Sequence, residues 1–83
     1  MAAEKIDKRS VVPLYLQVAA LLRQRITTGN LTGMLPGERP MARRYGVSVG
    51  TYRKALAVLR GEGLVETWRG RGTGVPPRRG KPG

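Results

Sequence analysis

The sequence contains no cysteine, no histidine and no phenylalanine, and it has only five acidic residues. Without cysteine or histidine it offers neither a disulfide nor the usual ligands of zinc, which excludes a zinc finger and fits a reducing compartment. No apolar run approaches the roughly 20 residues that span a bilayer, and the N-terminus has no apolar core of a secretory signal. We therefore expect one small soluble cytoplasmic domain with no membrane partner, no metal and no cofactor.

The same shortages argue against an enzyme. No histidine or cysteine is present for nucleophilic or acid–base chemistry, and no pair of carboxylates is expected to share a site. Glu62 and Glu66 are predicted at a helix end and in a strand, in solvated surroundings. The glycine-rich segment at 69–74 neither follows a parallel-type strand nor opens a helix, as a nucleotide-binding loop would.

Positive charge is abundant. Sixteen lysines and arginines give a net charge of +11 on 83 residues. Six cations and no acid lie between Arg39 and Gly61, and five cations and no acid lie from Thr67 to the end. The first 12 residues are mixed in sign, so the excess belongs to the remainder of the chain. An excess of this size points to a polyanionic partner.

The segment from Glu38 to Arg60 has the pattern of two helices joined by a tight turn. We expect a first helix over 38–45, ended by Gly46, which adopts a left-handed conformation without steric cost. Ser48 is a suitable N-cap for a second helix over 49–61. Apolar residues three and four apart form one buried stripe on that helix: Val49, Tyr52, Leu56 and Leu59. Together these features predict a helix-turn-helix.

The flanking segments complete a recognisable domain. An amphipathic helix is predicted from Leu14 to about Thr28, with Pro13 in its first turn. The breakers in 31–37 predict a loop with a very short strand around Met34 and Leu35, and Met34 is expected in the core. Strands at 64–68 and 73–75 flank a turn, which makes a β-hairpin wing.

The predicted fold is therefore α+β and mainly α: a winged helix-turn-helix with three helices and a two- or three-stranded β-hairpin wing. We place this domain at residues 13–75. Residues 1–12 are predicted to be a flexible N-terminal arm, and residues 76–83 a basic flexible tail.

The chain resembles the N-terminal DNA-binding domain of GntR-family bacterial transcriptional regulators. The resemblance covers about residues 12–75 and rests on consecutive motifs at the family's separations. These motifs are Pro13-Leu14-Tyr15, Leu35-Pro36-Gly37-Glu38-Arg39, Tyr45-Gly46-Val47-Ser48, Thr51-Tyr52-Arg53-Lys54-Ala55-Leu56, Glu62-Gly63-Leu64-Val65-Glu66 and Arg69-Gly70-Arg71-Gly72-Thr73. The resemblance implies sequence-specific binding of double-stranded DNA and regulation of transcription, as a repressor, at the bacterial nucleoid.

The resemblance also implies which positions approach DNA: the start of the second helix, the first turns of the recognition helix and the tip of the wing. The chemistry of the residues adds further cations on the helix expected to cross the phosphate backbone and on the exposed turn. For each the alternative is a solvated surface. The predicted DNA-binding residues are Arg39, Arg43, Arg44, Ser48, Val49, Gly50, Thr51, Arg53, Lys54, Arg69, Gly70 and Arg71.

Three departures from the family pattern affect the expectations. Many members have Arg-Thr where this chain has Val49 and Gly50, so its base preference must differ. An aromatic residue commonly stands at the position of Gly74, so we expect a loosely packed wing. Members normally continue into a C-terminal domain that binds a small effector and dimerises. This chain ends without one, as a short member or an excised domain, and no small-molecule effector site is evident in it.

Two other functions also fit the sequence. The chain could be a non-specific architectural nucleic-acid binder, because Val49 and Gly50 replace a base-reading pair. It could also be a protein-interaction module, since winged helices bind proteins too. For the leading interpretation, a homodimer on DNA is the expected productive form, with half-sites one helical turn, about 34–36 Å, apart.

Overall fold

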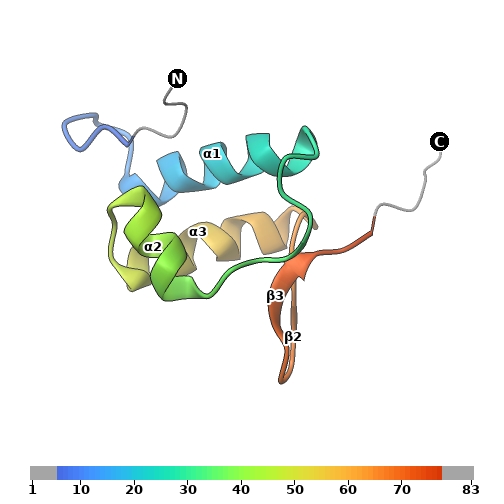
Figure 1. Cartoon of the computed structure of the whole chain (residues 1–83). Helices are drawn as coiled ribbons and strands as arrows, with labels where there is room; N and C mark the ends of the chain where they lie inside the picture. Colours follow the sequence, from blue (N-terminus) through green and yellow to red (C-terminus); the bar gives the residue numbers. More distant parts are fainter. Residues whose placement is uncertain (1–5, 78–83) are drawn as a thin grey trace.

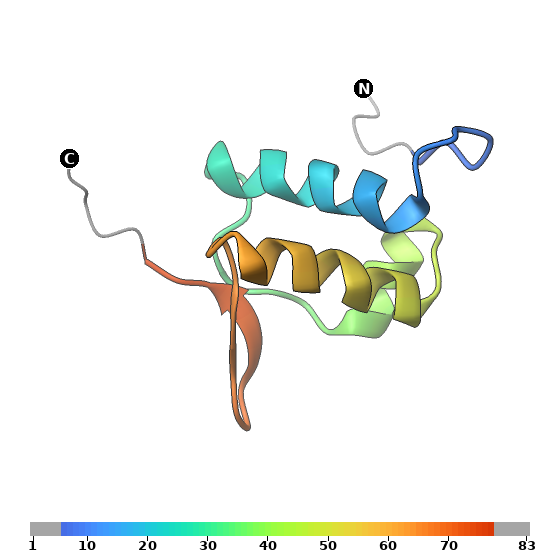
Figure 2. The same cartoon turned by 180° about the vertical axis from the view of Figure 1, so that it is seen from behind.

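The structure is a computed structural model, which describes residues 6–77. The elements follow in the order α1 (Leu14–Thr27), β1 (Gly33–Met34), α2 (Glu38–Tyr45), α3 (Val49–Gly61), β2 (Glu66–Trp68) and β3 (Gly72–Val75). Figures 1 and 2 show α1 and α3 side by side, with α2 against the first half of α3 and the β2–β3 hairpin extending away from α1. This arrangement confirms the predicted winged helix-turn-helix.

The core lies among the three helices. Apolar side chains at helical spacing on α1 and α3 face each other, as the sequence pattern predicted, and both helices contribute side chains that are completely buried. The short α2 covers one end of this pair. The buried residues are Val18, Ala19, Leu22, Ile26, Met41, Ala42, Tyr45, Tyr52, Ala55, Leu56, Leu59 and Val65.

α1 begins at Leu14, as predicted, but Pro13 lies just outside its first turn. Pro13 is the N-cap, with φ −54° and ψ 145°, and not a residue of the first turn. Its extended ψ places it outside the helix, while its carbonyl accepts from the amides of Leu16 and Gln17 at 3.0 and 3.2 Å. The ring still serves the helix start, because φ is already near its helical value.

Part of the predicted arm contacts α1. The Gln17 side chain accepts from the Asp7 amide at 2.8 Å and donates to the carbonyls of Asp7 and Val12, both at 2.9 Å. These bonds hold residues 7–12 beside the first turns of α1. Residues 1–5, and residues 78–83 of the predicted tail, lie outside the described residues.

The sheet has the strand order β1-β3-β2, and both pairings are antiparallel. The predicted strand at 64–68 is too long, because β2 begins only at Glu66. The cause is the end of α3. Gly63 has φ 77°, and the Leu64 amide donates to the Leu59 carbonyl at 3.0 Å. That amide caps the helix and is not available to the sheet.

The wing packs closely at Gly74, against our expectation. Met34 pairs with Gly74 across β1 and β3, and Gly74 is buried. A Cβ at this position would lie 2.9 Å from the Gly33 carbonyl oxygen and 2.9 Å from Met34 Sδ. Met34 is not a core residue as predicted, since it is 48% exposed; its side chain lies over Gly74 instead. Glycine is thus the residue that lets β1 approach β3.

Replacing Gly74 with alanine should destabilise the domain by about 1–3 kcal/mol, because backbone atoms of β1 must move. Amide exchange at Leu35, which donates to the Thr73 carbonyl at 2.9 Å, would report the loosening locally. Gly61→Ala is the matched control, since no described atom lies within 4 Å of a Cβ there and alanine favours the helix. Equal effects of the two substitutions would contradict the close packing.

Tyr52 provides a test of the core by titration. Burial, with smaller contributions from Tyr45 and Glu38, raises the pKa of its phenol from 10.0 to about 12. Between these values the unfolded chain releases the proton while the folded one keeps it, so stability falls as pH rises above about 10. The full loss is about 2–3 kcal/mol. Denaturant unfolding at several alkaline pH values should show a shallower decline for Tyr52→Phe; an identical decline would contradict the burial.

Candidate nucleic-acid interface

The turn between α2 and α3 has the geometry expected of a helix-turn-helix. Gly46 ends α2 in the left-handed conformation, with φ 68°. Ser48 caps α3: its Oγ accepts from the Thr51 amide at 3.0 Å and lies 3.0 Å from Thr51 Oγ1. Both local predictions are confirmed. The cap orders the first turn of α3, where base and phosphate contacts were predicted.

The predicted contact residues on α3 differ in how far they face solvent. Gly50, Arg53 and Lys54 are exposed, whereas Thr51 is half-buried. Val49 is also half-buried and packs against the core, so only part of its side chain is accessible. The outward face of the helix is thus cationic and carries no bulky apolar group in its first turns.

Arg53 is held by the first residue of α2. Its Nε donates to Glu38 Oε1 at 2.8 Å, and its Nη2 donates to Oε2 at 2.7 Å. These hydrogen bonds hold the pKa of the Glu38 carboxyl below its usual value and raise the pKa of Arg53. Arg53, one of the predicted DNA-binding residues, therefore has a defined orientation relative to α2.

Lys54 points in a different direction. Its Nζ lies 5.3 Å from the centre of the Tyr15 ring, within the range of a cation–π contact. This contact joins α3 to the first turn of α1. Lys54 and Arg53, although adjacent in sequence, thus have partners on different helices, α1 and α2.

Three further predicted cations lie on α2. Arg39, Arg43 and Arg44 are all exposed. No side chain within residues 6–77 caps the start of α2, where Gly37 is the N-cap. Arg39 lies in this first turn, at the positive end of the helix dipole, which is a favourable place for a phosphate.

The wing brings the remaining predicted residues to an exposed tip. Arg69, Gly70 and Arg71 are all exposed. Gly70 has φ 77°, and the Arg71 amide donates to the Trp68 carbonyl at 2.9 Å, which closes the turn. The hairpin extends away from α1 in both views (Figures 1 and 2), so its tip is separate from the core.

A polar chain of contacts connects the wing to α3. Arg60 Nη1 donates to Thr67 Oγ1 at 3.0 Å, and Thr67 Oγ1 lies 3.0 Å from Thr73 Oγ1 on the paired strand. No role was predicted for Arg60. Thr67 and Thr73 lie on the two predicted wing strands, but no sequence signal indicated that an arginine near the end of α3 would reach them.

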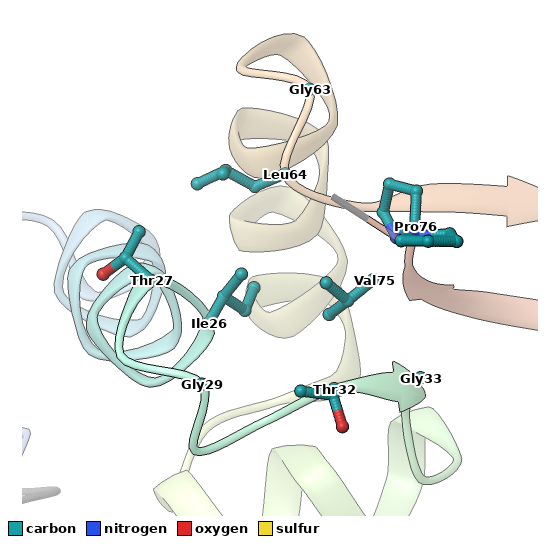
Figure 3. Close-up of a pocket in the computed structure, with 10 residues that line it drawn as sticks. Ile26, Thr27, Gly29, Thr32, Gly33, Gly63, Leu64, Val75 and Pro76 are labelled. Carbon is teal, nitrogen blue, oxygen red and sulfur yellow. The ribbon is translucent and has the colours of Figure 1, made fainter. Parts of the chain in front are cut away.

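Two hollows of the described residues bear on these assignments. The smaller, about 400 Å³, lies between the wing and the helix-turn-helix and is lined by Glu38, Tyr52 and Arg71 among others. The larger, about 580 Å³, is shown in Figure 3; Ile26, Leu64 and Val75 line it from three parts of the chain, and no predicted DNA-binding residue does. Its lining side chains are apolar apart from Thr27 and Thr32.

No group of three or more acidic, histidine or cysteine side chains within residues 6–77 could hold a metal ion. None of the helices there is long and apolar enough to cross a bilayer.

The fold and the exposed cationic helix define a winged helix-turn-helix domain of the kind found in bacterial regulators. Comparison with known sequences identifies the family: the profile of the bacterial regulatory proteins, gntR family, matches residues 14–75. The chain belongs to the GntR family.

Relatives with the same domain are transcription regulators. An uncharacterised HTH-type transcriptional regulator of Rhizobium meliloti, RB1450, is 41% identical over 75 residues, covering 88% of this chain and 31% of the relative. The transcriptional repressor NagR of Bacillus subtilis is 42% identical over 72 residues, covering 84% of this chain and 30% of NagR. The chain thus spans about a third of the length of these curated relatives.

Solved structures show the same fold. YtrA of Sulfolobus acidocaldarius, a GntR-family transcription factor, superposes with a TM-score of 0.81 at 31% identity, covering 94% of this chain and 84% of YtrA. The DNA-binding domain of AraR, in complex with operator ORE1, superposes with a TM-score of 0.73 at 29% identity, covering 88% of this chain and 92% of that domain.

Proposed function

We propose that this chain binds double-stranded DNA sequence-specifically and regulates transcription as a repressor at the bacterial nucleoid. The observation that supports this most strongly is the outward presentation of a capped, cationic α3 on a fold shared with a domain solved on operator DNA. A major groove admits an α-helix, and arginine donates to guanine O6 and N7.

The proposed contacts divide by element. Ser48, Gly50, Thr51 and Arg53 on the first turns of α3 face the major groove, with the accessible part of Val49. Arg39, Arg43 and Arg44 on α2, together with Lys54, contact phosphates. The wing tip, with Arg69, Gly70 and Arg71, enters the minor groove, where a narrow groove attracts arginine.

Two copies on adjacent half-sites are the proposed productive form. One such module buries only about 600–1,000 Å² of protein surface on DNA, and pairing raises the affinity through effective concentration. Half-sites one helical turn apart, about 34–36 Å, would match a symmetric pair.

Selection of bound duplexes from a random pool, followed by competition with scrambled sequence, tests this function. We expect an enriched motif and an affinity that falls with log salt at a slope near −0.9 per phosphate contacted. If scrambling the sequence lowers the affinity by less than about tenfold, an architectural binder would be favoured instead. The absence of a side chain at Gly50, on the exposed face of α3, also fits that function. Absence of duplex binding at low salt would contradict both and leave a protein-interaction module.

A further inference from the structure

The Glu38–Arg53 pair leaves one edge of the arginine open. A guanidinium has five N–H groups in a planar fork, and Glu38 occupies the edge formed by Nε and Nη2. Among residues 6–77, no contact occupies the opposite edge, formed by Nη1 and the second hydrogen of Nη2. That edge also presents two parallel donors, the arrangement that matches guanine O6 and N7.

The pair is attached to the start of α2 at one end and accessible to solvent at the other. Glu38 is the first residue of α2, where a carboxylate is favoured by the helix dipole. The Arg53 side chain is 65% exposed and that of Glu38 is 40% exposed. A long exposed arginine would otherwise lose rotamer freedom on binding, and the carboxylate removes much of that freedom beforehand.

The position of the acid on the surface is otherwise unfavourable for a DNA-binding protein. Glu38 is bordered in sequence by Arg39 and lies in an interface whose other charged members are all basic. A carboxylate there repels phosphates, so it weakens binding to every sequence alike. An improvement in discrimination between sequences would offset this general loss of affinity.

We propose that Glu38 is a specificity-determining positioning residue, which holds the guanidinium of Arg53 so that its Nη1–Nη2 edge recognises guanine. This inference rests on the proposed DNA-binding function. Glu38 itself contacts no base. It lowers affinity for DNA in general and raises the preference for a site with guanine opposite Arg53.

The test uses the full chain and the duplex selected for the unaltered protein. Binding is measured to this duplex, to versions with each base pair changed singly, and to scrambled DNA. Glu38→Gln removes the charge but keeps the shape of the side chain. We expect discrimination at one guanine position to fall about tenfold, while binding to scrambled DNA stays equal or becomes tighter.

Glu62→Gln is the matched control. Glu62 forms the same two-bonded pair with Arg23, at 2.8 and 2.6 Å, but that pair joins the end of α3 to α1. Its substitution removes one negative charge from the protein, as Glu38→Gln does. It should leave discrimination at the guanine unchanged, and circular dichroism of both variants would verify that they fold.

A double-mutant cycle assigns the effect to Arg53. In an Arg53→Ala background, Glu38→Gln should change guanine discrimination by less than about twofold, because the group it positions is gone. The proposal would be overturned if Glu38→Gln kept the full preference for guanine, or if it lost no more of that preference than Glu62→Gln. Additive effects of Glu38→Gln and Arg53→Ala on guanine discrimination would also overturn it. If the unaltered protein itself binds scrambled and selected duplexes equally, it is the proposed function that fails.

Discussion

Replacing Arg53 with alanine should reduce the affinity for the selected duplex by about 1–3 kcal/mol and relax the base preference at one position. Arg53 is the longest donor on the exposed face of α3's first turns, and Glu38 holds it in a defined orientation. Its loss removes two donors from a base edge and leaves Glu38 unpaired beside the DNA. Titration against the selected duplex and its single-base variants measures both effects.

Two further variants separate reading of bases from attraction to phosphates. Arg53→Lys keeps the charge but not the planar fork, so discrimination should fall while the salt slope is retained. Arg39→Ala should weaken all sequences alike and reduce the salt slope by about 1. If Arg53→Ala and Arg39→Ala acted identically on every duplex, α3 would not be the element that recognises sequence.

Leu59→Ala should be the most damaging change to stability, with a loss of about 2–5 kcal/mol. Leu59 is completely buried on α3, on the face that packs against α1. The whole stability of a small domain is only about 5–15 kcal/mol, so this loss is a large share of it. Urea unfolding should show a lower midpoint with an unchanged slope.

Leu16→Ala is the control for the loss of leucine methyl groups. Leu16 is 38% exposed on α1, so its truncation should change stability by no more than about 0.5 kcal/mol. A comparable loss in both variants would mean that the α1–α3 contact is not the principal core.

Local features of the helix-turn-helix were predictable because each depends on residues close together in sequence. Gly46 ends α2 through its own backbone freedom, and Ser48 caps α3 through an amide three residues away. The apolar stripe of α3 follows from helical periodicity alone. The turn of the wing was predictable for the same reason. The start of β2 was not, because it depends on how α3 ends.

The contacts that orient the proposed DNA-binding residues were not predictable. Arg53 donates to Glu38, which lies 15 positions away in the sequence, and Lys54 contacts the ring of Tyr15 on a different helix. Met34 covers Gly74 only because β1 pairs with β3. Each of these depends on the angles at which helices and strands pack, and no periodic pattern in the sequence encodes those angles.

The family, the order of helices and strands, the charge of the molecule and the outward face of α3 all follow from the order of residues, because composition, periodicity and turn chemistry are local properties. Which cations are held, and in which direction they point, depends on the packing of the folded chain. Side chains of arginine and lysine are long and flexible, so their direction is set by whichever partner the folded chain brings within reach.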